Sequence, residues 1–119
     1  MYPHVNADEF ARNWIKAWNS HQIDAILSHY AEDVEFTSPF VVRLLNQPDG
    51  ILHGLADLRS YFLKGLEAYP DLHFELIEVL EGVNSVTLYY HSVKNLISAE
   101  VMVLNEKGKI TKALAHYSV

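Results

Sequence analysis

The chain contains no cysteine and few basic residues. Without cysteine it forms no disulfide, no thiolate metal site, no iron–sulfur cluster and no cysteine nucleophile. Nine lysines and arginines stand against fifteen aspartates and glutamates, which gives a net charge of −6, and the basic residues are scattered along the chain. An acidic chain without a basic stripe binds nucleic acid and anionic membranes poorly. We therefore expect neither as a partner.

Long apolar runs are also missing, since none approaches the ~20 residues of a membrane span. The first residues, Met1–Glu9, have neither the cationic start nor the apolar core of a signal peptide. Together with the absence of cysteine, this predicts a cytoplasmic location. The chain has 119 residues, of which 50% are hydrophobic and 20% charged. This balance predicts one globular domain over residues 1–119.

The spacing of hydrophobic residues predicts three helices in the first part of the chain. Asn6, followed by acidic residues, is typical of a helix start. Apolar residues then recur at helical spacing as far as Trp18. A short second helix is expected over 23–30, and a third over 55–68, where Tyr69-Pro70 ends it.

The rest of the chain favours strands. They are expected at 34–38 (stopped by Pro39), from Leu72 through Val79, and at 83–93, 97–104 and 109–119; the segment 40–53 shows no clear period. The alternation slips by one residue after Ile77, which is typical of a bulge that bends and twists a sheet. Helices followed by a run of antiparallel strands predict an α+β fold with the helices packed on one face.

Three segments carry a family resemblance. Asp24–Pro39 resembles the short second helix and first strand of the nuclear transport factor 2-like superfamily, in its SnoaL-like branch. His53-Gly54 is similar to the start of that superfamily's third helix, and Gly108-Lys109-Ile110 to the entry of its last strand. The resemblance extends along the whole chain. It implies a cone: a strongly bent antiparallel sheet packed against three N-terminal helices, with an apolar pocket inside.

The activities of this superfamily include ketosteroid isomerases, polyketide cyclases, dehydratases and epoxide hydrolases, and other members are non-catalytic modules. Carried over residue by residue, the isomerase pattern puts Ser38 at the position of the base and Trp14 at that of a tyrosine. The position of a protonated carboxylic acid falls on Glu100. Serine does not accept a proton near neutral pH, and the indole N–H is a donor of little acidity. We therefore do not expect steroid-type isomerisation.

Glu100 interrupts the segment Ile97–Leu104, which is otherwise apolar on both faces. A carboxyl group buried among apolar neighbours has a raised pKa and can act as an acid or base near neutrality. The alternative is a solvated edge residue or one partner of an ion pair in a dimer interface. Strand alternation decides which face Glu100 shares but not what covers it.

His91 is the expected catalytic partner of Glu100. A two-residue turn that includes Asn95 puts either His91 or Tyr89 directly opposite Glu100, and both then share its face. A three-residue turn puts Tyr90 there instead. A glutamate beside a histidine orients the imidazole as a base. The alternative is a sheet histidine whose ring is satisfied by a neighbouring hydroxyl group.

The pocket walls follow from the resemblance and from strand alternation. The residues expected to bind a ligand are Trp14, Ser38, Phe62, Tyr89, Met102, Ala113, Ala115 and Tyr117. The two alanines leave space that a packed core normally fills. We expect Trp14, Phe62, Glu100 and Tyr117 to line one cavity in the ~300–1,000 Å³ class of drug-sized ligands.

The sequence predicts neither a metal site nor a cofactor. It has seven histidines but no HxH, HxxxH or HExxH motif. A glycine-rich phosphate loop and a dinucleotide fingerprint are also missing.

The predicted function is the binding of a small, largely apolar molecule in the cone, with or without acid–base catalysis of the isomerase, cyclase or dehydratase type. The alternative is a non-catalytic ligand-binding or dimeric assembly module. A homodimer through the outer face of the sheet is expected as well. Val101 and Val103 make one face of their strand as apolar as Met102 and Leu104 make the other, which favours a covered surface.

Overall fold

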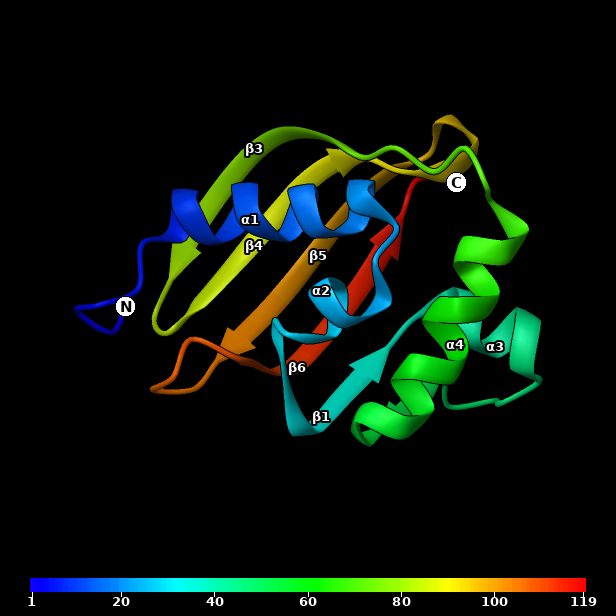
Figure 1. Cartoon of the computed structure of the whole chain (residues 1–119), viewed down its shortest axis with the longest axis horizontal. Helices are drawn as coiled ribbons and strands as arrows, with labels where there is room; N and C mark the ends of the chain where they lie inside the picture. The colour runs from blue at the N-terminus through cyan, green and yellow to red at the C-terminus, as the bar shows by residue number, and fades with distance from the viewer.

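The computed structural model describes all 119 residues (Figure 1). The helices are α1 (Ala7–Ser20), α2 (Ile23–Leu27), α3 (Pro39–Leu45) and α4 (Gly54–Ala68), with a 3₁₀ turn, η1, at Val93–Asn95. The strands are β1 (Tyr30–Thr37), β2 (Ile51–His53), β3 (Glu75–Gly82), β4 (Ser85–His91), β5 (Ile97–Leu104) and β6 (Ile110–Tyr117).

The six strands form one sheet in the order β2-β1-β6-β5-β4-β3. All neighbouring strands are antiparallel except β1 and β6, which run parallel. Helix α1 crosses one face of the sheet, and α4 lies beside β1 at the other end (Figure 1). The pairing of β3 with β4 shifts register between Leu76 and Glu78, so the bulge predicted after Ile77 is confirmed. The α+β class and the bent, cone-like sheet are confirmed too.

Helix α1 begins where its capping residue predicts. The side chain of Asn6 accepts the backbone N–H of Glu9 at 2.9 Å, which satisfies one of the free donors of the first turn. The helix ends at His21, whose backbone is left-handed with φ 59°. Its inner side carries the buried residues Ala7, Phe10, Ala11, Trp14, Ala17 and Trp18. The predicted amphipathic helix is therefore confirmed.

The segment without a clear period holds two elements that the sequence did not predict, α3 and β2. Ser38 caps α3, because its Oγ accepts the backbone N–H of Phe40 at 3.2 Å, and Pro39 suits the first turn of a helix. With seven residues and only Val41 buried, α3 is too short for a periodic pattern to show. There are consequently four helices rather than three.

The second helix is shorter than predicted. It ends at Leu27, and Tyr30 is already the first residue of β1. No helix of the chain is both long and apolar enough to cross a bilayer. The assignment of residues 1–119 to one domain and the cytoplasmic location stay predictions.

The segment that leads into β3 is tied to the C-terminal end of α1. Asn19 Nδ2 donates to the carbonyl oxygen of Phe74 at 2.9 Å, and the Phe74 N–H donates to Asn19 Oδ1 at 2.7 Å. The amide side chain of Asn19 thus pairs with both the C=O and the N–H of Phe74. His21 adds a contact of 2.7 Å between its Nε2 and the carbonyl oxygen of Leu72. These bonds hold Phe74 against α1.

We expect Asn19→Ala to lower the free energy of unfolding by about 1–3 kcal/mol, because both backbone groups of Phe74 lose their partner. Urea denaturation measures this. Asn13→Ala is the matched control, because Asn13 is an exposed residue of the same helix and gains the same helix propensity. Equal stabilities of the two variants would contradict the structural role of Asn19.

Candidate functional site

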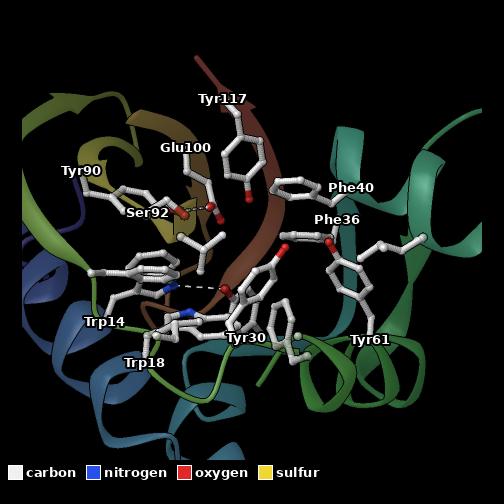
Figure 2. Close-up of a pocket in the computed structure, with 17 residues that line it drawn as sticks. Trp14, Trp18, Tyr30, Phe36, Phe40, Tyr61, Tyr90, Ser92, Glu100 and Tyr117 are labelled. Carbon is white, nitrogen blue, oxygen red and sulfur yellow. Dashed lines mark hydrogen bonds between the residues drawn. The ribbon is translucent and has the colours of Figure 1, made fainter. Parts of the chain in front are cut away.

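A cavity of about 80 Å³ lies between α1, α4 and the concave face of the sheet (Figure 2). Fourteen of its seventeen lining residues are hydrophobic. The lining comprises Trp14, Trp18, Tyr30, Phe36, Phe40, Leu44, Tyr61, Phe62, Gly65, Tyr69, Leu72, Phe74, Tyr90, Ser92, Val93, Glu100 and Tyr117. Leu44 of α3, which is 59% exposed, belongs to the rim. The mouth therefore lies next to the short helix that the sequence did not predict.

Two tryptophans one turn apart on α1 close one end of the cavity. The ring of Trp14 packs edge-on against Tyr90, with 5.3 Å between the ring centroids, and stacks on Phe74 at 5.9 Å. The ring of Trp18 meets Phe62 edge-on at 4.6 Å. Such offset and edge-to-face contacts are favourable arrangements of aromatic rings. They fill much of the cone with side-chain atoms.

Glu100 is the only residue of the cavity lining whose side chain can be charged near neutral pH. It lies on β5 opposite Leu88 of β4 and Ala115 of β6, and is 3% exposed. The hydroxyl group of Tyr90 donates to Glu100 Oε1 at 3.0 Å, whereas Oε2 has no partner in the chain. Burial raises the pKa of Glu100 to about 7, and the Tyr90 hydrogen bond opposes part of this rise.

Four tyrosines that line the cavity lie near enough to Glu100 for its charge to affect their pKa: Tyr30, Tyr61, Tyr90 and Tyr117 (Figure 2). Burial raises the pKa of all four, and the Glu100 carboxylate raises each of them further. The pKa of Tyr61 reaches about 12. The phenols therefore keep their protons at neutral pH and remain hydrogen-bond donors.

The two indole N–H groups differ in their surroundings. Trp14 Nε1 donates to Tyr30 Oη at 3.1 Å, and this bond is buried. Trp18 lies close enough to Tyr30 to lower the pKa of its phenol, but Trp18 Nε1 has no hydrogen-bond partner in the chain. Trp18 Nε1 and Glu100 Oε2 are the two buried side-chain polar atoms left without a partner, and both residues line the cavity.

Four of the predicted site residues line this one cavity, namely Trp14, Phe62, Glu100 and Tyr117. The expected size was wrong, because about 80 Å³ falls well below the ~300 Å³ at which pockets for drug-sized ligands begin. The role of these four residues in binding or catalysis stays a prediction.

The predicted pairing of His91 and Tyr89 with Glu100 was wrong. His91 pairs with Ile97, so the five residues 92–96 separate β4 from β5. Side chains alternate along a strand, so an odd number of loop residues exchanges the inward-facing and outward-facing residues of β4 relative to a two-residue turn. His91 and Tyr89 are exposed on the outer face, and Tyr90 shares the inner face with Glu100. The three-residue turn considered as an alternative also has an odd number of residues, so it likewise turns Tyr90 to the face of Glu100.

Met102, Ala113, Ala115 and Ser38 are buried but do not line the cavity. The first three are on the inner face of the sheet, where Met102 pairs with Ala113 and Glu100 with Ala115. Ser38 caps α3. Its hydroxyl group opposes part of the rise in the pKa of Tyr61 and Tyr117, so Ser38 lies near these two cavity residues.

Sequence reasoning missed several cavity residues, among them Trp18, Tyr30 and Phe40, and it placed Tyr90 opposite Glu100 only for a three-residue turn. The signal for Trp18 was its spacing from Trp14, which puts both on one helix face. The odd-length turn was the signal for Tyr90. Phe40 lies in the segment that showed no period, so nothing in the sequence pointed to it.

The side chains offer no obvious metal site. No group of three histidine, aspartate or glutamate residues lies close enough together to hold an ion. The polar atoms of the cavity are one carboxyl group, hydroxyl groups and indole N–H groups. This set suits proton exchange and hydrogen bonding with a neutral molecule.

Known structures share this fold. A SnoaL-like protein of unknown function from Burkholderia thailandensis is 43% identical, with a TM-score of 0.92 over 95% of this chain and 94% of the other. SalBIII, an epoxide hydrolase/cyclase-like enzyme with a role in pyran ring formation in the polyether salinomycin, is 17% identical (TM-score 0.79, 100% and 95% covered). A candidate ketosteroid isomerase from Kribbella flavida is 16% identical (TM-score 0.72, 93% and 76% covered).

At identities this low, the last two relatives show the fold alone. No curated protein sequence matches the chain. The family model of the SnoaL-like domain matches residues 11–112. The resemblance found in the sequence is thus confirmed over most of its length, and the chain belongs to the SnoaL-like domain family.

Proposed function

We propose that the chain binds a small, largely apolar molecule in this cavity and exchanges a proton with it through Glu100. The surroundings of Glu100 carry the proposal: its carboxyl group is buried without a cation, and Oε2 is left unpaired at the cavity. With a pKa of about 7, both protonation states are populated at neutral pH. An acid–base catalyst needs this balance.

The rest of the cavity supports this role. Neutral phenols can donate hydrogen bonds to a ligand oxygen, and such bonds are stronger in an aromatic environment than in water. We assign Ser38 no part in the proton exchange, because it does not line the cavity and a serine hydroxyl group does not accept a proton near neutral pH. Glu100 would remove a proton at one position of the ligand and return it at another, in a reaction of the isomerase, cyclase or dehydratase type.

The relatives are consistent with such chemistry. They include a cyclase-like enzyme and a candidate ketosteroid isomerase. Because a shared fold does not imply a shared reaction, the proposal rests on Glu100 rather than on these names.

The second candidate is a non-catalytic ligand-binding or dimeric assembly module. The size of the cavity favours the assembly form of this candidate, because about 80 Å³ leaves room for only a small ligand. The two candidates differ in one respect that can be measured: only the first accelerates a proton transfer.

Glu100→Gln removes the titrating group and nearly keeps the shape. We expect the wild-type protein at pH 8 in D₂O to accelerate exchange of the α-hydrogens of cyclopentanone, followed by ¹H NMR. The variant should lose about 100-fold or more of this acceleration. Glu75→Gln, at an exposed carboxylate of β3, is the control and should keep it. Wild-type rates in Glu100→Gln would exclude Glu100 as the base. Binding of cyclopentanone without any acceleration would favour the non-catalytic module.

The stability of the protein should depend on pH through Glu100. Its pKa is about 7 in the folded state against 4.5 ordinarily, so the folded state holds the proton more tightly. The protonated carboxyl group therefore stabilises the folded state. This contribution is fully present below pH 4.5 and is lost as the pH rises from 4.5 to about 7. The groups that face Glu100 are Tyr30 of β1, Tyr90 of β4 and Tyr117 of β6, with Tyr61 of α4, and none of them titrates in this range.

Urea denaturation at several pH values tests this. Relative to Glu100→Gln, the wild-type protein should lose on the order of 3 kcal/mol between pH 4.5 and 8. The structure indicates that the carboxyl group is desolvated. If the free energies of unfolding of the two proteins changed with pH in the same way, this would be contradicted.

The homodimer through the outer face of the sheet is part of the proposal. Tyr89 and Val103 are 39% and 37% exposed on this face, next to the half-buried Val101 and Leu114. Exposed apolar sheet surface favours a partner. Light scattering at micromolar concentration should give twice the mass of one chain. Val101→Glu should shift the mass to that of a monomer, since two copies bring like charges together. Val83→Glu, in the β3–β4 turn, is the control. A monomeric wild-type protein would contradict the dimer.

A further inference from the structure

Trp18 is buried in a way that leaves one strong donor unused. The residue is 7% exposed, and its Nε1 has no partner in the chain. A buried N–H without a partner costs free energy comparable to a lost hydrogen bond. Its neighbour Tyr30 accepts the N–H of Trp14, and no hydrogen bond joins Tyr30 Oη to Trp18 Nε1. Trp18 lies at the lower edge of the cavity, beside Tyr30 (Figure 2). An acceptor that enters the cavity can satisfy the indole.

The second unpaired atom, Oε2, belongs to Glu100, which lines the same cavity. An indole N–H only donates, whereas a carboxyl group accepts when ionised and donates when protonated. A carbonyl or hydroxyl oxygen accepts from Trp18, and an acidic hydrogen next to it, or on it, can face Glu100. Such a group satisfies both atoms at once.

The charge of the cavity restricts the ligand further. No lysine, arginine or histidine is among the lining residues, and the ionisable carboxyl group belongs to Glu100. A carboxylate or phosphate ligand would meet no counter-charge and would be repelled by Glu100. The walls offer aromatic rings instead. A neutral molecule with one oxygen function therefore fits the lining best.

We propose that Trp18 Nε1 is the donor that anchors the ligand, and that it binds the carbonyl or hydroxyl oxygen of a neutral molecule whose acidic hydrogen faces Glu100 Oε2. This inference rests on the proposed binding function and names its ligand class. It assigns a specificity role to a tryptophan that was not among the predicted site residues.

The indole resonances of the ¹⁵N-labelled wild-type protein report directly on the anchor. The chain has two tryptophans, and the resonance that disappears in Trp18→Phe identifies Trp18. Adding cyclopentanone or cyclopentanol should move this indole ¹H resonance downfield, because a new hydrogen bond forms. Methylenecyclopentane, which has the shape of the ketone but no oxygen, should not. Comparing the shift of this resonance with cyclopentanone and with cyclopentanol shows whether the indole prefers a carbonyl or a hydroxyl oxygen.

The variants measure the contribution of the bond. Trp18→Phe keeps an aromatic ring against Phe62. Phe10→Leu is the control, at a buried residue of the same helix that does not line the cavity. The affinity for cyclopentanone relative to methylenecyclopentane should fall about 2- to 10-fold in Trp18→Phe and stay unchanged in Phe10→Leu. The ratio cancels any general loosening of the cavity. Cyclopentanecarboxylate should bind none of the three proteins in the cavity.

Two failures are distinguishable. If cyclopentanone and methylenecyclopentane bind equally well and the Trp18 resonance responds to neither or to both alike, the anchor is wrong while cavity binding stands. If no neutral probe shifts any resonance of the cavity residues, the proposed binding function fails and the anchor fails with it. A wild-type affinity ratio retained in Trp18→Phe overturns the anchor as well.

Discussion

Trp14 is the side chain on which the arrangement of the cone depends. It is 1% exposed, packs against Phe74 and Tyr90, and donates its N–H to Tyr30. One residue of α1 thereby contacts the segment before β3, the strand β4 and the start of β1. A tryptophan can do this because it combines a large apolar surface with one polar atom, which here is satisfied. The cluster gives this part of the cone an apolar, aromatic lining.

That apolar lining changes the behaviour of Glu100. The carboxyl group has one hydrogen bond and no cation to offset the loss of water, so its neutral form is favoured. An apolar side chain at this position would pack at lower cost. Sites where packing is given up for a polar group are typical of function. The unpaired N–H of Trp18 is a second such cost in the same cavity.

The elements that could be predicted rest on local signals. The capping residue Asn6 and the helical spacing after it define α1, and the slip after Ile77 marks the bulge of β3. The short helix α3 escaped prediction, because only one of its residues is buried and its cap, Ser38, is an ordinary serine in the sequence. As a result the rim of the cavity, with Phe40, could not be foreseen.

The sequence by itself determined the α+β cone, the inward face of α1, and the presence of a carboxyl group within an apolar strand. Only the tertiary structure decided what surrounds that carboxyl group. The loop between β4 and β5 has an odd number of residues, which turns Tyr90 inward and His91 outward. Because side chains alternate along a strand, one residue more or less in this loop would exchange the two faces. The size of the cavity and the unpaired indole of Trp18 depend on side chains from distant parts of the chain, which no local pattern encodes.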